Sequence, residues 1–296
     1  MTDYPGIKAL GMNALSINAL GKNTLSLTAE ERFGIKTEPN DVEKLLGYIR
    51  GTYGRVDPEI IDKVFKSGEA ADFLTVNETY FFREPAHFSF LRDLLPSFEK
   101  TGIRICSAAV ASGCEAYSIA MLIEAYNRVI EKPLPYSIDA FDINPKVIDT
   151  ACRGIYSSRT LREDGSNFRF MAAPYLKKLE SKYPEGTSGI NLGGQYQVDL
   201  SLRKNISFFV HNLMEGLPVK EYDIIFFRNA FIYFSPRYRE RILTNLIAVL
   251  KEGGILIMGV SETAGVHHAG IEGRNRNDVF YFQKPGFAAK KPDTRH

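Results

Sequence analysis

The region after Thr101 alternates short apolar runs with helical patterns, and this alternation restricts the fold more than any other feature of the chain. Helical patterns begin after the motif SGCEAY, at Pro145 and at Pro236. The apolar runs of strand type cover 103–110, 136–142, 206–210, 222–228, 255–260 and 279–283. Because strand–helix alternation builds a mostly parallel sheet covered by helices, the sequence predicts the α/β class.

Residues 168–202 interrupt this alternation. The segment contains Pro184 and a run of glycines, and it ends in the alternating sequence GQYQVDLSL. Glycine and proline favour turns, whereas alternation of polar and apolar residues is typical of a strand with one buried face. We therefore expect a small antiparallel β-subdomain, inserted into the α/β domain at about 168–204.

The preceding segment, 41–98, has a helical but interrupted pattern. Asp41 is placed to cap a helix, and Gly51 and Gly54 are expected to break it. Asp57 followed by proline predicts a second N-cap with proline at the first helical position. A third helix is expected at 84–98. This part of the chain is therefore predicted to be a short helical domain.

Residues 9–28 read ALGMN-ALSIN-ALGKN-TLSLT, a repeat with a period of five. This period fits neither an amphipathic helix nor an alternating strand. A short β-helix coil and a loosely docked arm are both compatible with it, and we favour the arm because solenoids need about three or more stacked coils. The expected divisions are an arm at 1–40, a helical domain at 41–98, an α/β domain at 99–286 and a tail at 287–296.

Charge and cysteine content exclude several classes of protein. The 37 basic and 35 acidic residues give a net charge of +2, whereas a protein that binds nucleic acid through phosphates usually has a larger basic excess. The 3 cysteines cannot all pair and show no CxxC spacing, which argues against a disulfide scaffold and a zinc site. We find no signal-peptide pattern and no run of about 20 apolar residues. A cytoplasmic protein is therefore expected.

Informative residues follow the ends of the predicted parallel strands, where such sheets bind ligands. The loop ASGCE, with Gly113, follows the first strand. Because its single glycine meets no phosphate-loop consensus, the loop favours binding of a nucleoside without a phosphate. Asp142 ends the second strand and suits a ribose diol, although it could instead cap the next helix. Asn212 and Leu213 follow a third strand and could contact a base. The segment FRNAFIYF, which contains Arg228 and Asn229, lies at the end of a fourth strand.

Five segments together resemble the CheR-type methyltransferases, which use S-adenosylmethionine to methylate glutamate side chains of bacterial chemoreceptors. They are NETYFFREPAHF, SAAVASGCEAYSIAM, FDINPKVIDTACRGIY, HNLMEG and FRNAFIYF, and they occur in family order between Asn77 and about Glu262. The resemblance implies a class I methyltransferase, a Rossmann-like fold with a mostly parallel sheet, a small N-terminal helical domain and an inserted antiparallel β-subdomain.

The resemblance also implies the roles of individual residues. Asp142 would hold the ribose, while Arg83 and Tyr233 would lie nearest the transferred methyl group and act as the catalytic residues. A glutamate is already ionised at neutral pH, with a pKa near ~4.3, so that no general base is required. The expected cofactor contacts are Asn77, Thr79, Arg83, Gly113, Glu115, Asp142, Asn212, Leu213, Arg228 and Asn229.

Two features depart from the family pattern. Cys114 stands where the family has the first of two glutamates, and Ala116 replaces a proline. Cys114 near a helix N-terminus is either a thiol of lowered pKa or, as we favour, a buried inert one. The segment 41–98 is also shorter than the usual receptor-docking domain. The expected partner is therefore the cytoplasmic region of a chemoreceptor, with its identity open.

Other functions remain as alternatives. Methylation of a nucleic-acid amine is disfavoured because Asn229 is not followed by prolines. A degenerate protein that only senses S-adenosylmethionine or S-adenosylhomocysteine is suggested by the altered loop at 110–116. A metal site at His267 and His268 lacks a third ligand, so no metal is expected. The protein is expected to be a monomer, not embedded in a membrane and without a nucleic-acid partner.

Overall fold

The computed structural model describes residues 14–162, 169–179, 194–217, 221–264 and 266–286. The chain forms two compact units. The first comprises residues up to Val76 together with Tyr233–Tyr238, and the second comprises Asn77–Ile232 together with the chain from Arg239 onward. Among the described helices, none combines the length and the apolar character that crossing a membrane requires.

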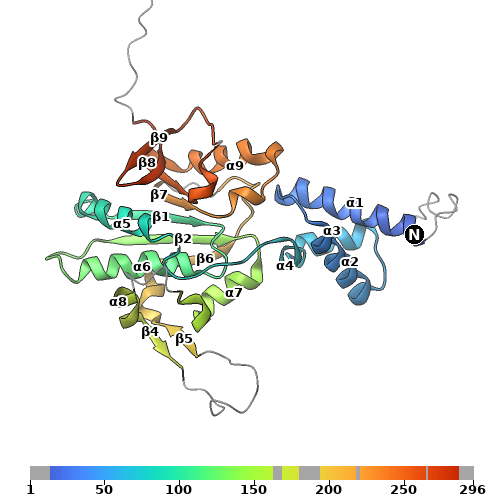
Figure 1. Ribbon diagram of the computed structural model, residues 1–296, viewed down its shortest axis with the longest axis horizontal. Helices are drawn as coiled ribbons and strands as arrows, with labels where there is room; N and C mark the ends of the chain where they lie inside the picture. Colours follow the sequence, from blue (N-terminus) through green and yellow to red (C-terminus); the bar gives the residue numbers. More distant parts are fainter. Residues whose placement is uncertain (1–13, 163–168, 180–193, 218–220, 265, 287–296) are drawn as a thin grey trace, which may run out of the picture. The chain divides into compact units, whose positions relative to one another are not determined.

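The first unit is helical (Figure 1). Its helices are α1 (Ala14–Phe33), α2 (Pro39–Tyr53), α3 (Pro58–Lys66) and α4 (Ala71–Leu74). Helix α1 packs against α2 and α3, where the rings of Phe33 and Phe65 lie 5.0 Å apart. The predicted cap of α3 is confirmed, because the Asp57 carboxylate accepts a hydrogen bond from the Ile60 N–H at 3.0 Å.

Two expectations for this unit are wrong. The interpretation of residues 9–28 as neither helix nor strand fails, because α1 extends from residue 14 and buries Leu25, Ala29 and Phe33 at a spacing of four. That spacing, rather than the five-residue repeat, matches a helical face. Helix α2 begins at Pro39 instead of Asp41 and continues through Gly51, although it does end at Gly54, as expected. Its buried apolar stripe offsets the cost of about 1 kcal/mol for a glycine inside a helix.

The second unit is built on a seven-stranded sheet with the order β6-β2-β1-β7-β8-β10-β9 (Figure 1). Its strands are β1 (Ile103–Ala108), β2 (Tyr136–Asp142), β6 (Ile206–Val210), β7 (Tyr222–Phe227), β8 (Leu250–Met258), β9 (Glu272–Arg276) and β10 (Val279–Gln283). The strands from β6 to β8 pair in parallel, and β10 runs antiparallel to both neighbours. The predicted α/β class and the mostly parallel sheet are confirmed.

Helices cover this sheet. They are α5 (Pro85–Leu94), α6 (Cys114–Asn127), α7 (Pro145–Arg153) and α9 (Pro236–Ala248), the last of which starts in the first unit. Helix α6 packs on β2, and α7 packs on β2 and β6. The first three turns of α6 are buried on nearly every side, which places the N-terminus of α6 deep in the core.

The predicted antiparallel insertion is present as a separate three-stranded sheet with the order β3-β5-β4, but one of its strands lies before the expected start at residue 168. Its strands are β3 (Ile155–Ser157), β4 (Leu176–Lys178) and β5 (Gln195–Val198), with a short helix α8 (Arg169–Ala172) before β4. All its pairs are antiparallel. The glycine-rich part of the insertion, at 180–193, lies outside the described residues.

Candidate active site

The sheet changes direction between β1 and β7. From β1 the chain proceeds outward through β2 to β6, whereas from β7 it proceeds outward through β8 to β10. Ligands of open α/β sheets bind beyond the carboxyl ends of the strands at such a switch point. Residues predicted for cofactor binding follow the ends of the strands on both sides of it: Gly113, Glu115, Asp142, Asn212, Leu213, Arg228 and Asn229.

Arg228, directly after β7, is the charged centre of this edge. Its side chain is 1% exposed, and its Nη1 donates a hydrogen bond to Glu115 at 2.9 Å. Glu115 in turn accepts a hydrogen bond from the Ser107 hydroxyl of β1 at 2.6 Å. Arg228 Nη2 also donates to the carbonyl oxygen of Arg83. The network therefore connects the ends of β1 and β7 across the switch point.

Two further carboxylates, which were not among the predicted site residues, belong to this network. Glu84 Oε2 lies 3.2 Å from Arg228 Nη2, and Glu84 Oε1 accepts a hydrogen bond from Asn229 Nδ2 at 2.9 Å. Glu262 accepts hydrogen bonds from the N–H groups of Asn229 and Gly259. The position of Glu84 beside Arg83 was a usable signal, whereas the segment VSETAG gave none for Glu262.

Asp142 ends β2 and is 7% exposed. Oδ2 accepts a hydrogen bond from the Ala111 N–H at 2.9 Å, and Oδ1 accepts one from the Asn144 N–H at 3.0 Å. Burial raises the pKa of this carboxyl despite these donors. The cap of α7 is Asn144, whose side chain accepts from the Lys146 N–H. Since a carboxylate has about four acceptor positions, Asp142 retains capacity for a ligand.

The loop after β1 is shaped by Gly113, which caps α6 with a φ of 90°. A Cβ at this position would lie 2.7 Å from the Cβ of Ala151 in α7 and 3.2 Å from the ring of Phe208 in β6. Glycine is therefore required for the packing of α6 against its neighbours. This packing requirement is separate from the cofactor contact that is expected of Gly113.

Cys114 follows in the first turn of α6 and is completely buried. Burial raises the pKa of its thiol to about 12, while contacts with Ser112 and Thr79 oppose that rise. The alternative of a thiol activated by the helix N-terminus is therefore wrong for this structure. The contact also places Thr79, a predicted cofactor residue, beside the start of α6.

Backbone strain is concentrated at this edge. Seven non-glycine residues of the described chain have positive φ angles. Two of them, Asn277 and Asp278, form the tight turn between β9 and β10, where such angles are usual. The other five are Phe82, Glu84, Ala109, Ala111 and Asn229. Strained residues persist where the surrounding contacts fix them, and they cluster at functional sites.

The two predicted catalytic residues belong to different compact units. Arg83, in the second unit, donates a hydrogen bond to the carbonyl oxygen of Glu78 at 3.1 Å and lies 5.6 Å from the Tyr80 ring centroid. The Glu78 carboxylate pairs with Arg162 instead. Tyr233, in the first unit, is 38% exposed and accepts a backbone bond from the Lys36 N–H. That Arg83 and Tyr233 both lie nearest the transferred methyl group stays a prediction.

The remaining predicted residues lie at the end of β6 and before α5. The His211 N–H donates to the Asp142 carbonyl oxygen at 2.9 Å, which holds the segment after β6 beside the end of β2. Asn212 Oδ1 accepts a hydrogen bond from the Met214 N–H, and Leu213 is buried. Asn77 is the first residue of the second unit.

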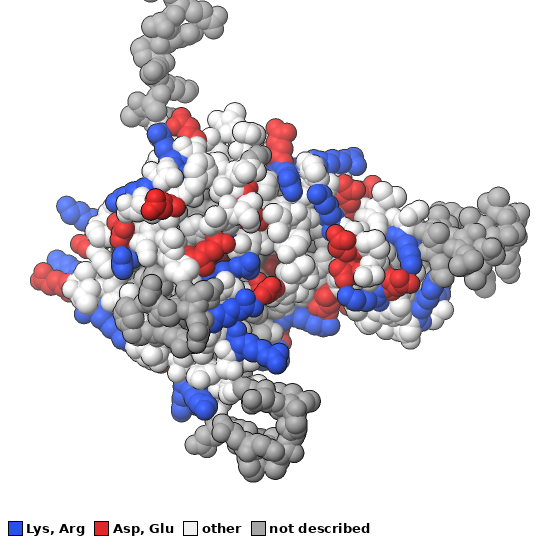
Figure 2. All heavy atoms as spheres, in the orientation of Figure 1, with Lys and Arg blue, Asp and Glu red and all other residues white. Residues whose placement is uncertain are grey.

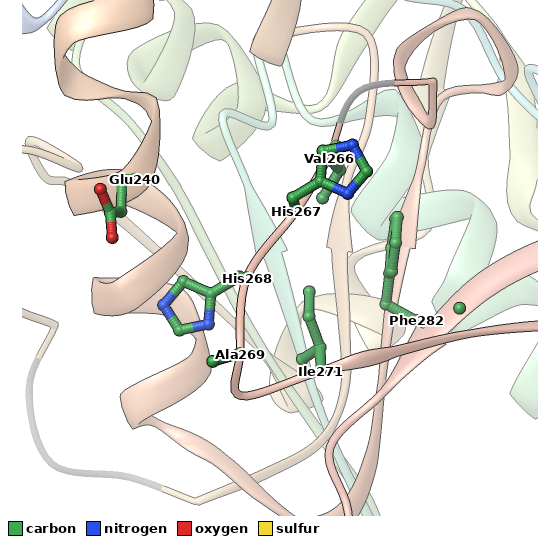
Figure 3. A pocket seen from close by; sticks show the side chains of 8 residues that line it. Glu240, Val266, His267, His268, Ala269, Ile271 and Phe282 are labelled. Atoms are coloured by element: carbon green, nitrogen blue, oxygen red, sulfur yellow. The ribbon is translucent and has the colours of Figure 1, made fainter.

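A separate cavity of about 500 Å³ lies between α9 and the segment before β9 (Figure 3). Figure 3 shows His268 on the side of Glu240 and His267 beside Val266, with the apolar side chains of Ile271 and Phe282 also lining the cavity. Within the described part of the chain, no group of three or more histidine, cysteine or acidic side chains is arranged to hold a metal ion. None of the predicted site residues lines this cavity.

Comparison with known proteins places the same segments in one family. Residues 77–272 match the family model described as CheR methyltransferase, SAM binding domain. A chemotaxis protein methyltransferase of Vibrio cholerae is 35% identical over 199 residues, covering 66% of this chain and 67% of that protein. One of Borreliella burgdorferi is 33% identical with the same coverage. A TehB-like SAM-dependent methyltransferase of Corynebacterium glutamicum has a TM-score of 0.35 at 12% identity, covering 67% of this chain and 97% of that one.

Proposed function

The chain belongs to the CheR methyltransferase family, and from this premise we propose that it transfers a methyl group to glutamate carboxylates in the cytoplasmic region of a chemoreceptor. Its fold is that of a class I S-adenosylmethionine-dependent methyltransferase. Membership makes it a chemotaxis protein methyltransferase that acts as a protein-glutamate O-methyltransferase.

The observation that carries this proposal is the network of Ser107, Glu115 and Arg228 across the switch point between β1 and β7. It lies within the matched family segment, 77–272. It also brings residues 113 positions apart in the chain to the strand ends where such a sheet binds its ligand.

The residues at this edge fit S-adenosylmethionine. Arg228 Nε is buried and has no hydrogen-bond partner among the described residues. Buried donors nearly always have a hydrogen-bond acceptor, and the carboxylate of the cofactor's methionine part would supply one here. Asp142, at the end of β2, has acceptor capacity for the ribose hydroxyls. Asn212 and Leu213 follow β6 and would flank the adenine.

When bound, S-adenosylmethionine supplies an electrophilic methyl group on a sulfonium centre. The chain therefore has to place an acceptor carboxylate in line with that methyl group, since orientation accounts for much of such a rate enhancement. We assign Arg83 to steering the carboxylate and Tyr233 to orienting it through the phenol. No residue needs to remove a proton, because the acceptor glutamate is already ionised near pH 7.

The same proposal covers location and assembly: a monomer that acts in the cytoplasm, where the methylated region of a chemoreceptor lies. Lys and Arg side chains are interspersed with Asp and Glu on the described surface shown in Figure 2. That distribution suits recognition of a protein better than a continuous basic surface would. Light scattering during gel filtration tests the monomer, for which a mass near 33.3 kDa is expected.

Calorimetry with S-adenosylmethionine tests the cofactor site. The Asp142→Ala variant should bind about 10- to 100-fold more weakly, because a hydrogen bond to a charged group contributes about 1.5–3 kcal/mol. Asp149→Ala is the matched control, since Asp149 is an exposed residue of α7 that pairs with Arg153. Equal affinity of the Asp142→Ala variant and the wild-type protein would contradict the assignment.

A further inference from the structure

Glu84 lies where three parts of the second unit meet, and no role has been assigned to it above. Its Oε1 accepts a hydrogen bond from Asn229 Nδ2 at 2.9 Å, and its Oε2 lies 3.2 Å from Arg228 Nη2. Oε2 also accepts a longer bond, 3.4 Å, from the Val260 N–H after β8. His87 Nδ1, one turn along α5, is 3.2 Å from the same oxygen. The carboxylate therefore connects the start of α5 to the ends of β7 and β8.

The backbone on both sides of Arg83 is fixed in an unusual conformation. Phe82 and Glu84 have φ angles of 54° and 58°, in the left-handed region. The Phe82 N–H donates to the buried Ser118 hydroxyl at 3.0 Å, and the Arg83 carbonyl oxygen accepts from Arg228. Non-glycine residues keep such angles only where their surroundings hold them. On the C-terminal side of Arg83, the contacts of the Glu84 carboxylate keep the backbone in this conformation.

Asn229 is held from two directions. Its side chain donates to Glu84, and its own N–H donates to Glu262 at 2.6 Å. Its φ of 57° is also in the left-handed region. Glu84 thus reaches the residue after Arg228, and it belongs to the same short segment as Arg83. The Glu84 carboxylate therefore links two predicted parts of the site. One is the segment of Arg83, which is expected to steer the acceptor, and the other is the end of β7, which is expected to bind the cofactor.

We propose that Glu84 is a positioning residue for methyl transfer, which holds the Arg83 segment in a fixed place relative to Arg228 and Asn229 through the contacts of its carboxylate. The inference rests on the proposed function. Glu84 touches neither reactant in this account and acts through Arg83. The relative placement of the acceptor and the methyl group depends on such contacts, since a displacement of about 1 Å can cost about 100-fold in rate.

The test is receptor methylation by the full chain carrying Glu84→Gln. We expect kcat to fall about 10- to 100-fold, while the Kd for S-adenosylmethionine, measured by calorimetry, stays within about 3-fold. Glutamine retains an acceptor for Asn229 but presents no charge to Arg228. The matched control is Glu124→Gln, whose carboxylate accepts from the Tyr136 hydroxyl at the opposite end of β2. That variant should keep the wild-type kcat.

A double variant separates positioning from a general effect on the fold. If Glu84 acts through Arg83, the Glu84→Gln change should cost little further rate in an Arg83→Ala background, so that the two effects are strongly non-additive. If the rate losses of the two single variants instead multiply in the double variant, the proposal is overturned. Loss of S-adenosylmethionine binding in Glu84→Gln would overturn it as well, because the role would then concern the cofactor.

A second variant covers the case in which Glu84→Gln does not fold. Glu84→Gly removes the carboxylate but accommodates the positive φ angle. A loss of kcat comparable to that expected for glutamine supports the carboxylate, and a wild-type kcat contradicts it. If the wild-type chain labels no receptor, the proposed function itself has failed and this inference fails with it. If the wild type labels receptors and both Glu84 variants match its rate, only the inference has failed.

Discussion

Single residues at the switch point show how this chain buries charge. Arg228 has a side chain that is 1% exposed, and carboxylates of Glu84 and Glu115 lie on either side of it. Removing a charge from water is costly unless partners of opposite charge and hydrogen bonds replace the solvent. The two carboxylates and the Arg83 carbonyl oxygen meet this requirement for both Nη atoms. The buried Nε has no hydrogen-bond partner among the described residues.

Glu84 should make stability depend on pH. Burial by itself raises the pKa of this carboxyl, but His87, Arg228 and Asn229 outweigh burial and hold the pKa well below its usual range. A carboxyl with a lowered pKa stabilises the fold above its unfolded pKa of about 4.3, and this stabilisation is lost as the pH falls through the folded value. The free energy of unfolding of the wild type should therefore decline more steeply below about pH 4.3 than that of Glu84→Gln.

Urea denaturation of both proteins across this pH range measures the difference. Asp142 and Glu262 have pKa values raised by burial, so that their contributions have the opposite sign and are lost as the pH increases. They are common to both proteins and cancel in the comparison. Parallel pH profiles would show that Glu84 does not have a lowered pKa.

Cysteine reactivity should distinguish the three thiols. Cys106 and Cys114 are fully buried, whereas Cys152 is half-buried. The thiolate is the reactive form, and burial raises the pKa of Cys114 to about 12. Titration of the native protein with a thiol reagent should therefore modify Cys152 first, and Cys106 and Cys114 should react only on unfolding. Rapid modification of Cys114 in the native state would contradict the buried, inert assignment.

At the scale of elements, the sequence predicted those with strong local signals. The limits of β2, α7, β6 and β10 agree with the expected ranges, because each combines an apolar pattern with a turn or proline at its boundary. Strand β9 was missed because all five of its residues are exposed and none has an apolar side chain, so only its pairing with β10 makes it a strand. Helix α1 was missed because its repeat obscured the buried spacing of four.

The N-terminus of α6 should depend on Gly113. In Gly113→Ala the new Cβ would meet Ala151 and Phe208 at a φ of 90°, so we expect a loss of about 1–3 kcal/mol in the free energy of unfolding. Gly216→Ala is the matched control, because a Cβ there meets nothing within 4 Å and the backbone is unstrained. Equal stability of the two variants, measured by urea denaturation, would contradict the packing role.

At the scale of the whole molecule, the sequence predicted the class of fold but only part of the site. The α/β class follows from local alternation, and the family follows from motifs in order along the chain. The pairing of Arg228 with Glu115, 113 residues apart, is a long-range contact that no local pattern encodes. Glu84 and Glu262 could not be assigned to the site from the sequence for the same reason, because the residues that they contact are 145 and 33 positions away along the chain.

The near-neutral charge of the whole chain agrees with this account. A transfer between a carboxylate and a sulfonium needs one cation near the acceptor rather than a basic face, and the net charge of +2 provides no general attraction for polyanions. Residues before Asn77, which form most of the first unit, lie outside the segment that matches the family.

The central claim is tested most directly by incubating the purified chain with methyl-labelled S-adenosylmethionine and the chemoreceptors of the same cell. We predict label on a receptor that is released by mild base, as expected for a glutamate methyl ester, and little label with Arg83→Ala. Binding of the cofactor without label on any receptor would contradict the proposed function and favour a sensor of S-adenosylmethionine.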